Sequence, residues 1–328
     1  MNEAASTARR ATERLDPDGR GLARAAALLA GGGLVAFPTE TVYGLGADAR
    51  NGRAVAALYA AKGRPRFNPL IAHVADIGSA RRQGMFDELA SRLAEAFWPG
   101  PLTLVVPAPA EMEVCDLARA GLASVALRVP GHEIASDLLR GCAFPVVAPS
   151  ANRSGRVSPT RADHVIADLD GRIDAVLDGG PTLIGIESTI VACLGGSPVL
   201  LRPGGIAREA IEDVLHARLG SGRQAPSAPL APGALLSHYA PRASVRLNAT
   251  TFRAGEAALL FGPMDARGAE PVLNLSPSAN LTQAAANLFG YLRRLDEKGP
   301  TAIAVAEIPE VGLGDAINDR LRRAAAPR

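Results

Sequence analysis

A segment rich in glycine, proline, serine and alanine divides this chain into two parts. Residues 220–233 read GSGRQAPSAPLAPG and show no hydrophobic period. Prolines keep such a segment semi-extended, so the composition is typical of a linker. We therefore expect a large N-terminal unit at residues 1–220, a linker region at 221–243 and a small C-terminal unit at 244–328.

The composition is that of an ordinary globular protein, with 48% apolar and 21% charged residues among 328. A disordered chain would be less hydrophobic and more highly charged. A net charge of +2 argues against a protein that binds nucleic acid by bulk electrostatics. Three widely spaced cysteines predict neither a disulfide framework nor a zinc site; they are Cys115, Cys142 and Cys193.

The sequence predicts a cytoplasmic protein without a membrane anchor. No apolar run approaches the roughly 20 residues that span a bilayer. The first 20 residues are polar and lack the apolar stretch of a secretory signal. We interpret them as a frayed or helical extension.

Short apolar runs alternate with helical patterns through the N-terminal unit. Helical patterns occupy residues 21–30, 53–62, 86–98, 132–140, 162–169 and 207–219. Runs typical of strands occupy residues 34–37, 70–74, 102–106, 124–129, 145–148, 175–177, 189–193 and 198–201. Some connections between them are short and others are long, unlike those of a regular βαβ repeat. This pattern predicts an α/β fold with a mixed sheet and flanking helices.

The C-terminal unit repeats this alternation on a smaller scale. Strand-like runs lie at 257–261, 272–275 and 302–305, and helical patterns at 280–295 and 315–325. This order predicts a small α/β, Rossmann-like domain with a parallel sheet.

The familiar nucleotide-binding loops are absent or incomplete. No GxxxxGK[ST] motif occurs, which excludes a P-loop. Residues 44–49 (GLGADA) fit a dinucleotide fingerprint, but that site needs a helix beginning in the loop and an acidic residue about 20 positions later. The following strand ends near His73, and the next acid is Asp76. We expect these glycines to allow close backbone packing instead.

Lysine is scarce in this chain and one lysine stands in a basic loop. Only Lys62 and Lys298 are lysines among 35 basic residues. Lys62 begins the sequence KGRPR, which follows a helix and precedes a strand ending at His73. Such a loop is either a clamp for a polyphosphate or a solvated basic surface.

Polar and cationic side chains mark the ends of several predicted strands. Ser150 and Asn152 follow one apolar strand, Ser188 precedes another, and Arg128 and Arg202 close two more. Because α/β sites are usually built where strands meet loops, this pattern predicts a functional site.

Eight ordered motifs together resemble the YrdC-like threonylcarbamoyl-AMP synthases. They are PTETVYGLG (38–46), KGRP (62–65), NPLI (68–71), WPGPLT (98–103), APSAN (148–152), DGG (178–180), ESTI (187–190) and LRPG (201–204). The resemblance covers about residues 20–220. The sequences PG (232–233) and SHYAP (237–241), before a small α/β unit, are similar to the long, two-domain form of that family.

This resemblance implies a YrdC-like twisted mixed sheet and an activity. The family joins L-threonine, bicarbonate and ATP into threonylcarbamoyl-adenylate and pyrophosphate. A downstream tRNA-modifying transferase complex uses the adenylate for the t6A37 modification of tRNA. A threonine carbamate attacks the α-phosphorus, so catalysis rests on positioning and electrostatics and requires no nucleophilic side chain.

The resemblance also implies two groups of site residues. The ATP side comprises Lys62, Arg64, Asn68, Ser124, Ser150, Asn152, Ser158 and Arg202, with Lys62 and Arg64 as the catalytic cations. The threonine side comprises Thr41, His73, Arg128, Ala148 and Ser188, with Arg128 pairing the carboxylate and His73 in a binding role. We expect Mg²⁺ to arrive with ATP, and no protein metal site, because no carboxylate cluster is evident.

Residues 235–239 (LLSHY) are amphipathic, which a pure tether would not need. We expect the segment 237–241 to fold over the mouth of the site, with Tyr239 contacting the nucleotide. Closure would protect the adenylate from water. A passive spacer is the alternative.

Two other functions remain open from the sequence. A double-stranded RNA-binding module would show salt-dependent binding without turnover. A carbamoyl-transfer domain of the hydrogenase-maturation type shares the YrdC-like fold but adds an acylphosphatase unit and CxxC modules, which are missing here. Direct tRNA binding is open and is not required.

Overall fold

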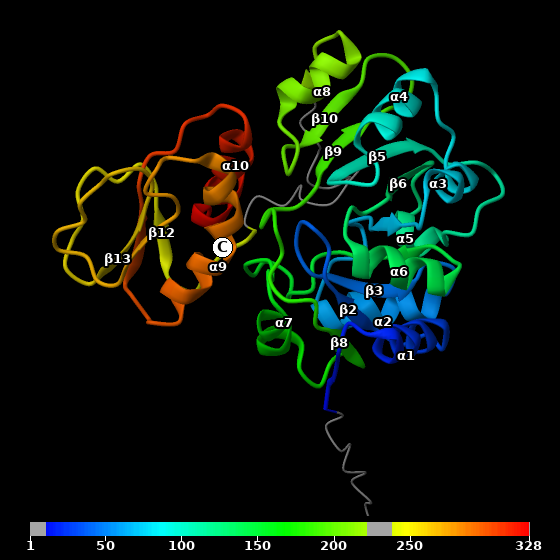
Figure 1. Cartoon of the computed structure of the whole chain (residues 1–328), viewed down its shortest axis with the longest axis horizontal. Coiled ribbons are helices and arrows are strands. Elements are labelled where there is room, and N and C mark those ends of the chain that lie inside the picture. The colour runs from blue at the N-terminus through cyan, green and yellow to red at the C-terminus, as the bar shows by residue number, and fades with distance from the viewer. Residues whose placement is uncertain (1–10, 222–237, 328) are drawn as a thin grey trace, which may run out of the picture.

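The computed structural model describes residues 11–221 and 238–327, which form two sheets with helices around them. The N-terminal part carries an 11-stranded sheet and the C-terminal part a four-stranded one. Figure 1 shows the two parts side by side. Within the described residues, no helix combines the length and the apolar character that crossing a bilayer demands.

The N-terminal sheet is mixed and its strands follow the order β1-β8-β2-β3-β7-β4-β6-β5-β9-β10-β11. The strands are β1 (Glu13–Leu15), β2 (Val35–Phe37), β3 (Gly44–Asp48), β4 (Ile71–His73), β5 (Leu102–Pro107), β6 (Ser124–Arg128), β7 (Val146–Val147), β8 (Ala175–Leu177), β9 (Thr189–Ala192), β10 (Val199–Arg202) and β11 (Gly220–Ser221). Strand β6, for example, is parallel to β4 and antiparallel to β5. The prediction of an α/β fold with a mixed sheet is confirmed.

Eight helices of this part are described. They are α1 (Gly19–Ala30), α2 (Gly52–Lys62), α3 (Ile77–Gln83), α4 (Glu88–Phe97), α5 (Asp116–Arg119), α6 (Glu133–Cys142), α7 (Ala162–Leu169) and α8 (Arg208–Leu215). Local side chains define their ends: the Asn51 side chain accepts from the first free amides of α2, and Gly63, with φ of 60°, closes that helix.

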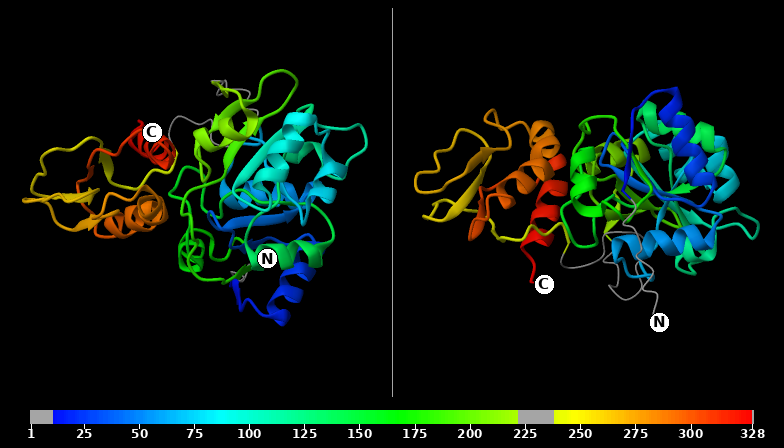
Figure 2. Two further views of the ribbon diagram at one scale, coloured as in Figure 1. Left: turned by 45° about the horizontal axis from the view of Figure 1, so that its top comes forward. Right: turned by 90° about the horizontal axis from the view of Figure 1, so that it is seen from below.

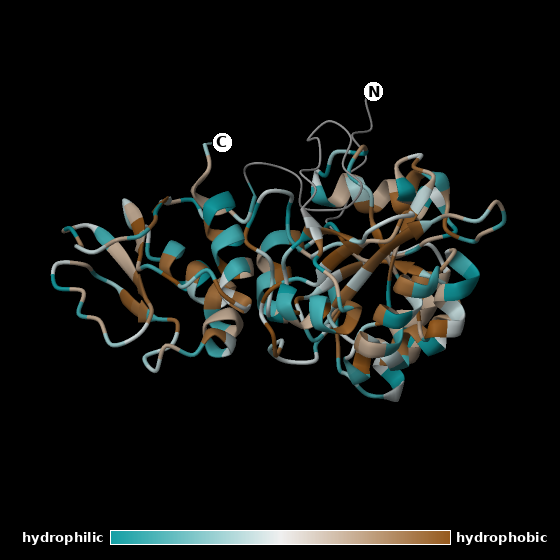
Figure 3. Cartoon of the chain, turned by 90° about the horizontal axis from the view of Figure 1, so that it is seen from above, coloured by the Kyte–Doolittle hydropathy of each residue, from teal (hydrophilic) through white to brown (hydrophobic). Residues whose placement is uncertain are grey.

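Alternation along the strands divides the apolar residues between the two faces of the sheet. Val35 and Phe37 pack with α1 and α6, whereas Ala36 packs on the opposite face with α2 and α7. Figure 3 shows the apolar strands inside and hydrophilic residues on the outer helices.

One face of strands β4, β5, β6 and β9 carries an apolar cluster that is made only of strand residues. A small cluster there consists of Ile71, Val105, Ala126, Ile190 and Ala192, all from strands. His73 and Arg128 lie two positions beyond Ile71 and Ala126, so they share this face, and they are partners in the β4–β6 register. This face is therefore where polar site residues gather.

The C-terminal part is a parallel sheet with two helices. It comprises β12 (Ser244–Arg246), β13 (Glu256–Leu260), β14 (Val272–Asn274), α9 (Leu281–Asp296), β15 (Ala302–Val305) and α10 (Leu313–Ala325). The order is β12-β15-β13-β14 and every pair is parallel, as predicted. Both views of Figure 2 place α9 and α10 between this sheet and the N-terminal part.

The two parts share one apolar cluster. Val42, Val157 and Ile186 of the N-terminal part pack with residues of α9 and α10 such as Phe289 and Ile317. Three loop residues of the N-terminal part are thus seated in the apolar core of the C-terminal part.

Two expectations about the N-terminal part need correction. Residues 13–15 are not a frayed or helical extension but a strand, because they pair in parallel with β8. Strand β3 was not predicted, since Gly44 and Gly46 have little strand propensity. The glycines do serve close packing: a Cβ on Gly46 would lie 3.0 Å from the carbonyl oxygen of Val35. Strand β3 runs antiparallel to β2, which is not the parallel arrangement of a dinucleotide-binding fold.

Candidate active site

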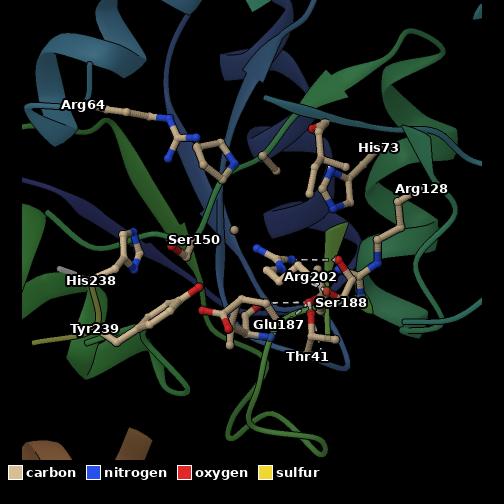
Figure 4. A pocket seen from close by; sticks show the side chains of 16 residues that line it. Thr41, Arg64, His73, Arg128, Ser150, Glu187, Ser188, Arg202, His238 and Tyr239 are labelled. Carbon is tan, nitrogen blue, oxygen red and sulfur yellow. Dashed lines mark hydrogen bonds between the residues drawn. The ribbon is translucent and has the colours of Figure 1, made fainter. Parts of the chain in front are cut away.

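A cavity lies where β4, β6 and β10 end, beside residues 238 and 239. Its lining comprises Thr39, Thr41, Val42, Gly44, Arg64, Ile71, His73, Arg128, Ala148, Pro149, Ser150, Glu187, Ser188, Arg202, His238 and Tyr239. Figure 4 shows His238 and Tyr239 on one side, His73 and Arg128 on the other, and Ser188 and Arg202 between them. The cavity encloses about 50 Å³ of free space.

The structure brings most of the predicted site residues to this cavity. Those in its lining are Thr41, Arg64, His73, Arg128, Ala148, Ser150, Ser188, Arg202 and Tyr239. Five others are buried but are not part of the lining: Lys62, Asn68, Ser124, Asn152 and Ser158. The two groups therefore differ in how directly they can meet a ligand.

Two arginines in the lining carry positive charge: Arg202 is buried and Arg64 is half-buried. Arg202 closes β10 and donates from Nε and Nη2 to the Ser188 carbonyl oxygen, at 3.2 and 2.8 Å. Burial lowers its pKa. Arg64 donates from Nη2 to the Pro69 carbonyl oxygen at 3.1 Å, and burial lowers its pKa to about 10. Because both contact neutral carbonyl groups, their charge is left to attract an anion.

Lys62 contacts the polypeptide backbone of a site loop. It is the last residue of α2, and its ammonium donates to the carbonyl oxygens of Ser150 and Asn152. Burial, with the charge of Arg64, holds the Lys62 pKa well below its ordinary value. Lys62 thus fixes the loop that carries Ser150 and stands outside the lining.

The other buried residues outside the lining have distinct surroundings. The amide oxygens of Asn68 and Asn152 are buried and accept no hydrogen bond from the described residues. Asn152 donates to the carbonyl oxygens of Arg153 and Arg156, which fixes its side chain. Ser124 begins β6, opposite Pro107 of β5.

The opposite side of the cavity holds one arginine and one neutral histidine. Nη2 of Arg128 lies 2.7 Å from a carboxylate oxygen of Glu40. Burial, and then the charge of Arg128, lowers the His73 pKa to about 3. His73 is therefore an uncharged hydrogen-bonding group at neutral pH. Thr41 and Ser188 contact other hydroxyls, Thr39 Oγ1 at 2.8 Å and Thr103 Oγ1 at 2.7 Å.

Sequence reasoning missed three polar lining residues: Thr39, which contacts Thr41, and the two titratable residues Glu187 and His238. Glu187 accepts from Ser158 Oγ at 2.5 Å through one oxygen and pairs with Arg320 Nε at 2.8 Å through the other. Glu187 and His238 lie inside quoted motifs, ESTI and SHYAP, but each was read only as part of its motif. Their adjacency to Ser188 and Tyr239 was the available signal.

The segment after the linker is held by contacts with both parts. Tyr239 has φ of 59° and its ring stacks on Phe289, with centroids 5.4 Å apart. The amide of His238 donates to Arg323, and that of Ala240 donates to Gly155. Residues 222–237, which include Ser237 of the expected lid and most of the expected linker, lie outside the described residues.

The described residues contain no group of three or more histidine, cysteine, aspartate and glutamate side chains arranged to hold a metal ion.

Two family models together match most of the chain. One, described as "Telomere recombination" and covering Sua5, YciO and YrdC proteins, matches residues 27–204. The other, "Threonylcarbamoyl-AMP synthase, C-terminal domain", matches residues 206–326. The threonylcarbamoyl-AMP synthase of Bacillus subtilis is 42% identical over 97% of this chain and 96% of its own length.

The chain belongs to the threonylcarbamoyl-AMP synthase family. The synthase of Pyrococcus abyssi is 41% identical, over 93% of this chain and 94% of the relative. The crystal structure of P. abyssi Sua5 complexed with L-threonine matches with a TM-score of 0.87 and 38% identity, covering 96% of this chain and 97% of that one. Both the resemblance to the two-domain threonylcarbamoyl-AMP synthases and the enzymatic class, with its place in t6A modification of tRNA, are confirmed.

Proposed function

We propose that this chain joins L-threonine, bicarbonate and ATP into threonylcarbamoyl-AMP and pyrophosphate, which supplies the adenylate for t6A modification of tRNA. One observation supports this most: a single cavity has Arg64 on one side, Arg128 with neutral His73 on the other, and Arg202 between them (Figure 4). This arrangement suits a polyphosphate and an amino-acid carboxylate that must react with each other.

Arg64 and Arg202 would neutralise the phosphates of ATP. A carbamate oxygen attacks the α-phosphorus and pyrophosphate leaves in line with it. Arg64 and Arg202 face negative charge that grows on the leaving group, and Ser150 supplies a hydroxyl donor. Lys62 acts by holding the loop of Ser150 and Asn152, in addition to its charge. Asn68, Ser124, Asn152 and Ser158 complete the proposed ATP side.

The second side would hold threonine. The related P. abyssi protein was crystallised with L-threonine, which supports a threonine site here. Arg128 offers the two-pronged donor geometry that a carboxylate fits. His73, uncharged, would accept or donate a hydrogen bond to the substrate rather than deliver a proton. Thr41, Ala148 and Ser188 would shape the remainder of this subsite.

We propose that Mg²⁺ enters bound to the phosphates of ATP, whose charge it screens. Among the described residues in the lining, Glu187 is the one carboxylate. Its oxygens already contact Ser158 and Arg320. The oxygens that suit Mg²⁺ are therefore those of the nucleotide.

The cavity as it stands is too small for both substrates. Its free space of about 50 Å³ is well below the roughly 300 Å³ at which small-molecule pockets begin. We propose that His238 and Tyr239 move to admit ATP and return over it, as a lid that excludes water.

We also propose a division of labour along the chain. Residues 1–220 would form the catalytic domain, 221–243 the linker and lid, and 244–328 the C-terminal domain. The protein would work in the cytoplasm with a downstream transferase complex, and the reaction requires no direct tRNA binding.

The test is an incubation of the full-length chain with ATP, Mg²⁺ and bicarbonate, with and without threonine. We expect pyrophosphate release that depends on threonine and on bicarbonate. Salt-sensitive binding of double-stranded RNA without pyrophosphate release would instead favour the RNA-binding module.

A further inference from the structure

One arginine of the C-terminal part reaches the loop that carries Glu187. Arg320 lies on α10, is completely buried, and places Nε 2.8 Å from Oε2 of Glu187. Arginine is almost never fully buried unless it is paired. The pair joins the two parts of the chain directly beside the cavity, because Glu187 is a lining residue.

The effect of Arg320 continues past Glu187. The second carboxylate oxygen of Glu187 accepts a hydrogen bond from Ser158 Oγ at 2.5 Å. The carbonyl oxygen of the next residue, Ser188, accepts one from Arg202 Nη2 at 2.8 Å. Burial would raise the Glu187 pKa, but the charges of Arg320 and Arg202 outweigh it and lower that pKa. An ionised Glu187 can hold the hydroxyl hydrogen of Ser158 in one direction.

Arg320 also contacts the segment after the linker. Its guanidinium carbon lies 5.2 Å from the centroid of the Tyr239 ring, a cation–π distance. Its Nη1 pairs with Asp319 at 2.7 Å. One buried side chain therefore meets two lining residues, Glu187 and Tyr239.

The backbone around Glu187 rests on the neighbouring helix. Gly185 has φ of 78°, and a Cβ there would lie 2.5 Å from the carbonyl oxygen of Ala285 in α9. Ile186 belongs to the shared apolar cluster. Helices α9 and α10 thus set the position of the loop, and Arg320 sets the direction of its carboxylate.

We propose that Arg320 is a positioning residue of the nucleotide subsite. Through Glu187 it orients Ser158, and by direct contact it orients Tyr239, so the ATP side is complete only when α10 is docked. This inference rests on the proposed function and assigns a task in it to the C-terminal part.

The experiment compares full-length Arg320→Gln with the wild type. We expect the KM for ATP in pyrophosphate release, and the Kd for ATP measured by calorimetry without threonine, to rise at least about tenfold, because one partner of a buried pair is lost. The KM for threonine should change by less than about threefold. Arg320→Lys keeps the positive charge but loses the planar, two-pronged donor geometry of the guanidinium. Its KM for ATP should therefore rise by less than that of Arg320→Gln, about threefold.

Arg246→Gln is the matched control. Nη2 of Arg246 pairs with Glu256 at 2.6 Å between β12 and β13, within the C-terminal sheet. The Arg246→Gln substitution removes an arginine–glutamate ion pair that lies away from the cavity. The KM and Kd for ATP should therefore stay as in the wild type. Thermal unfolding of both variants shows how much stability each loses.

The inference is overturned if Arg320→Gln binds ATP as the wild type does, or if Arg246→Gln weakens ATP binding equally. If Arg320→Gln does not fold, the Arg320→Lys protein decides, and an unchanged ATP KM and Kd refute the inference. A wild type that releases no threonine-dependent pyrophosphate refutes the proposed function alone, since the ATP Kd still tests Arg320.

Discussion

Arg128 and Glu40 form a buried ion pair, with Nη2 of the arginine 2.7 Å from Oε1 of the carboxylate. The two side chains are 4% and 6% exposed. Glu40 directly precedes Thr41, and Arg128 closes β6, so the pair connects a cavity loop to the sheet. An arginine held in this way keeps a fixed direction for its remaining donors, which favours tight orientation of a substrate carboxylate.

Replacing Arg128 should separate the two substrates. We expect Arg128→Ala to raise the KM for threonine much more than the KM for ATP, because a charged hydrogen bond of this kind contributes about 1.5–3 kcal/mol. The variant should also be less stable, since Glu40 is left buried and unpaired. Steady-state kinetics in both substrates and thermal unfolding check this. Equal increases in both KM values would show that the two sides are wrongly assigned.

Lys62→Ala should lower turnover by at least about tenfold, which corresponds to roughly 1.4 kcal/mol of transition-state stabilisation. The loop of Ser150 and Asn152 loses the ammonium that holds its carbonyl oxygens. Lys62→Arg should restore activity only in part, because a planar guanidinium cannot replace a compact ammonium in a buried position. Initial rates of pyrophosphate release measure both. Full activity in Lys62→Arg would show that a compact ammonium is not required at this position.

Tyr239→Ala tests the lid in the full-length chain. We expect the variant to lose or hydrolyse the adenylate faster than the wild type, because water reaches the closed site. Product is followed by chromatography during single turnover. Tyr291→Ala, in α9 and outside the cavity lining, is the control. Retention of the adenylate equal to the wild type would leave residues 237–241 as a tether.

Deleting the chain after Gly220 is a harsher form of the same test. It would also uncover Val42, Val157 and Ile186, which pack against the C-terminal helices. A loss of activity on deletion would therefore have two causes, the missing lid and the exposed apolar core. Unchanged synthesis and retention of the adenylate would contradict the lid.

Acid should destabilise the folded chain through two buried histidines. Burial lowers the pKa of His73 and of His238 to about 3, from an ordinary 6.5. As pH falls below 6.5 the unfolded chain binds protons on both residues and the folded chain does not, so the free energy of unfolding decreases until about pH 3. Each histidine contributes up to about 1.4 kcal/mol per pH unit.

Urea denaturation of the wild type and of His238→Asn at pH 7, 6, 5 and 4 measures this slope. The variant should lose free energy of unfolding less steeply on acidification. An identical slope in the two proteins would mean that His238 titrates normally in the folded chain.

Regular patterns in the sequence predicted most of the fold because they report local preferences. Helix α7 and strands β8 and β15 match their predicted ranges, since apolar period and flanking polar residues agree there. Strand β3 was missed because its glycines are needed for close packing. A Cβ on Gly44 or Gly46 would press against Ala148 or Val146, and these neighbours lie far away in the sequence. Strand β1 escaped because its three residues gain order only from pairing with β8.

The same distinction applies to the site. Motif residues such as Arg64 and Arg202 could be named because each lies at the end of a recognisable element. Arg320 could not, because it is one arginine in an arginine-rich chain and contacts a glutamate 133 positions earlier. Only the docking of α10 brings the two together.

That docking has a consequence for biosynthesis. Translation proceeds from the N-terminus, so the ribosome completes the sheet strands that end at His73, Arg128 and Arg202 before it begins α10. A nascent chain of that length already contains these cavity residues, while Glu187 still lacks its arginine and Ile186 lacks its apolar cover. On the proposal that Arg320 completes the nucleotide subsite, we expect such an unfinished polypeptide to form little adenylate.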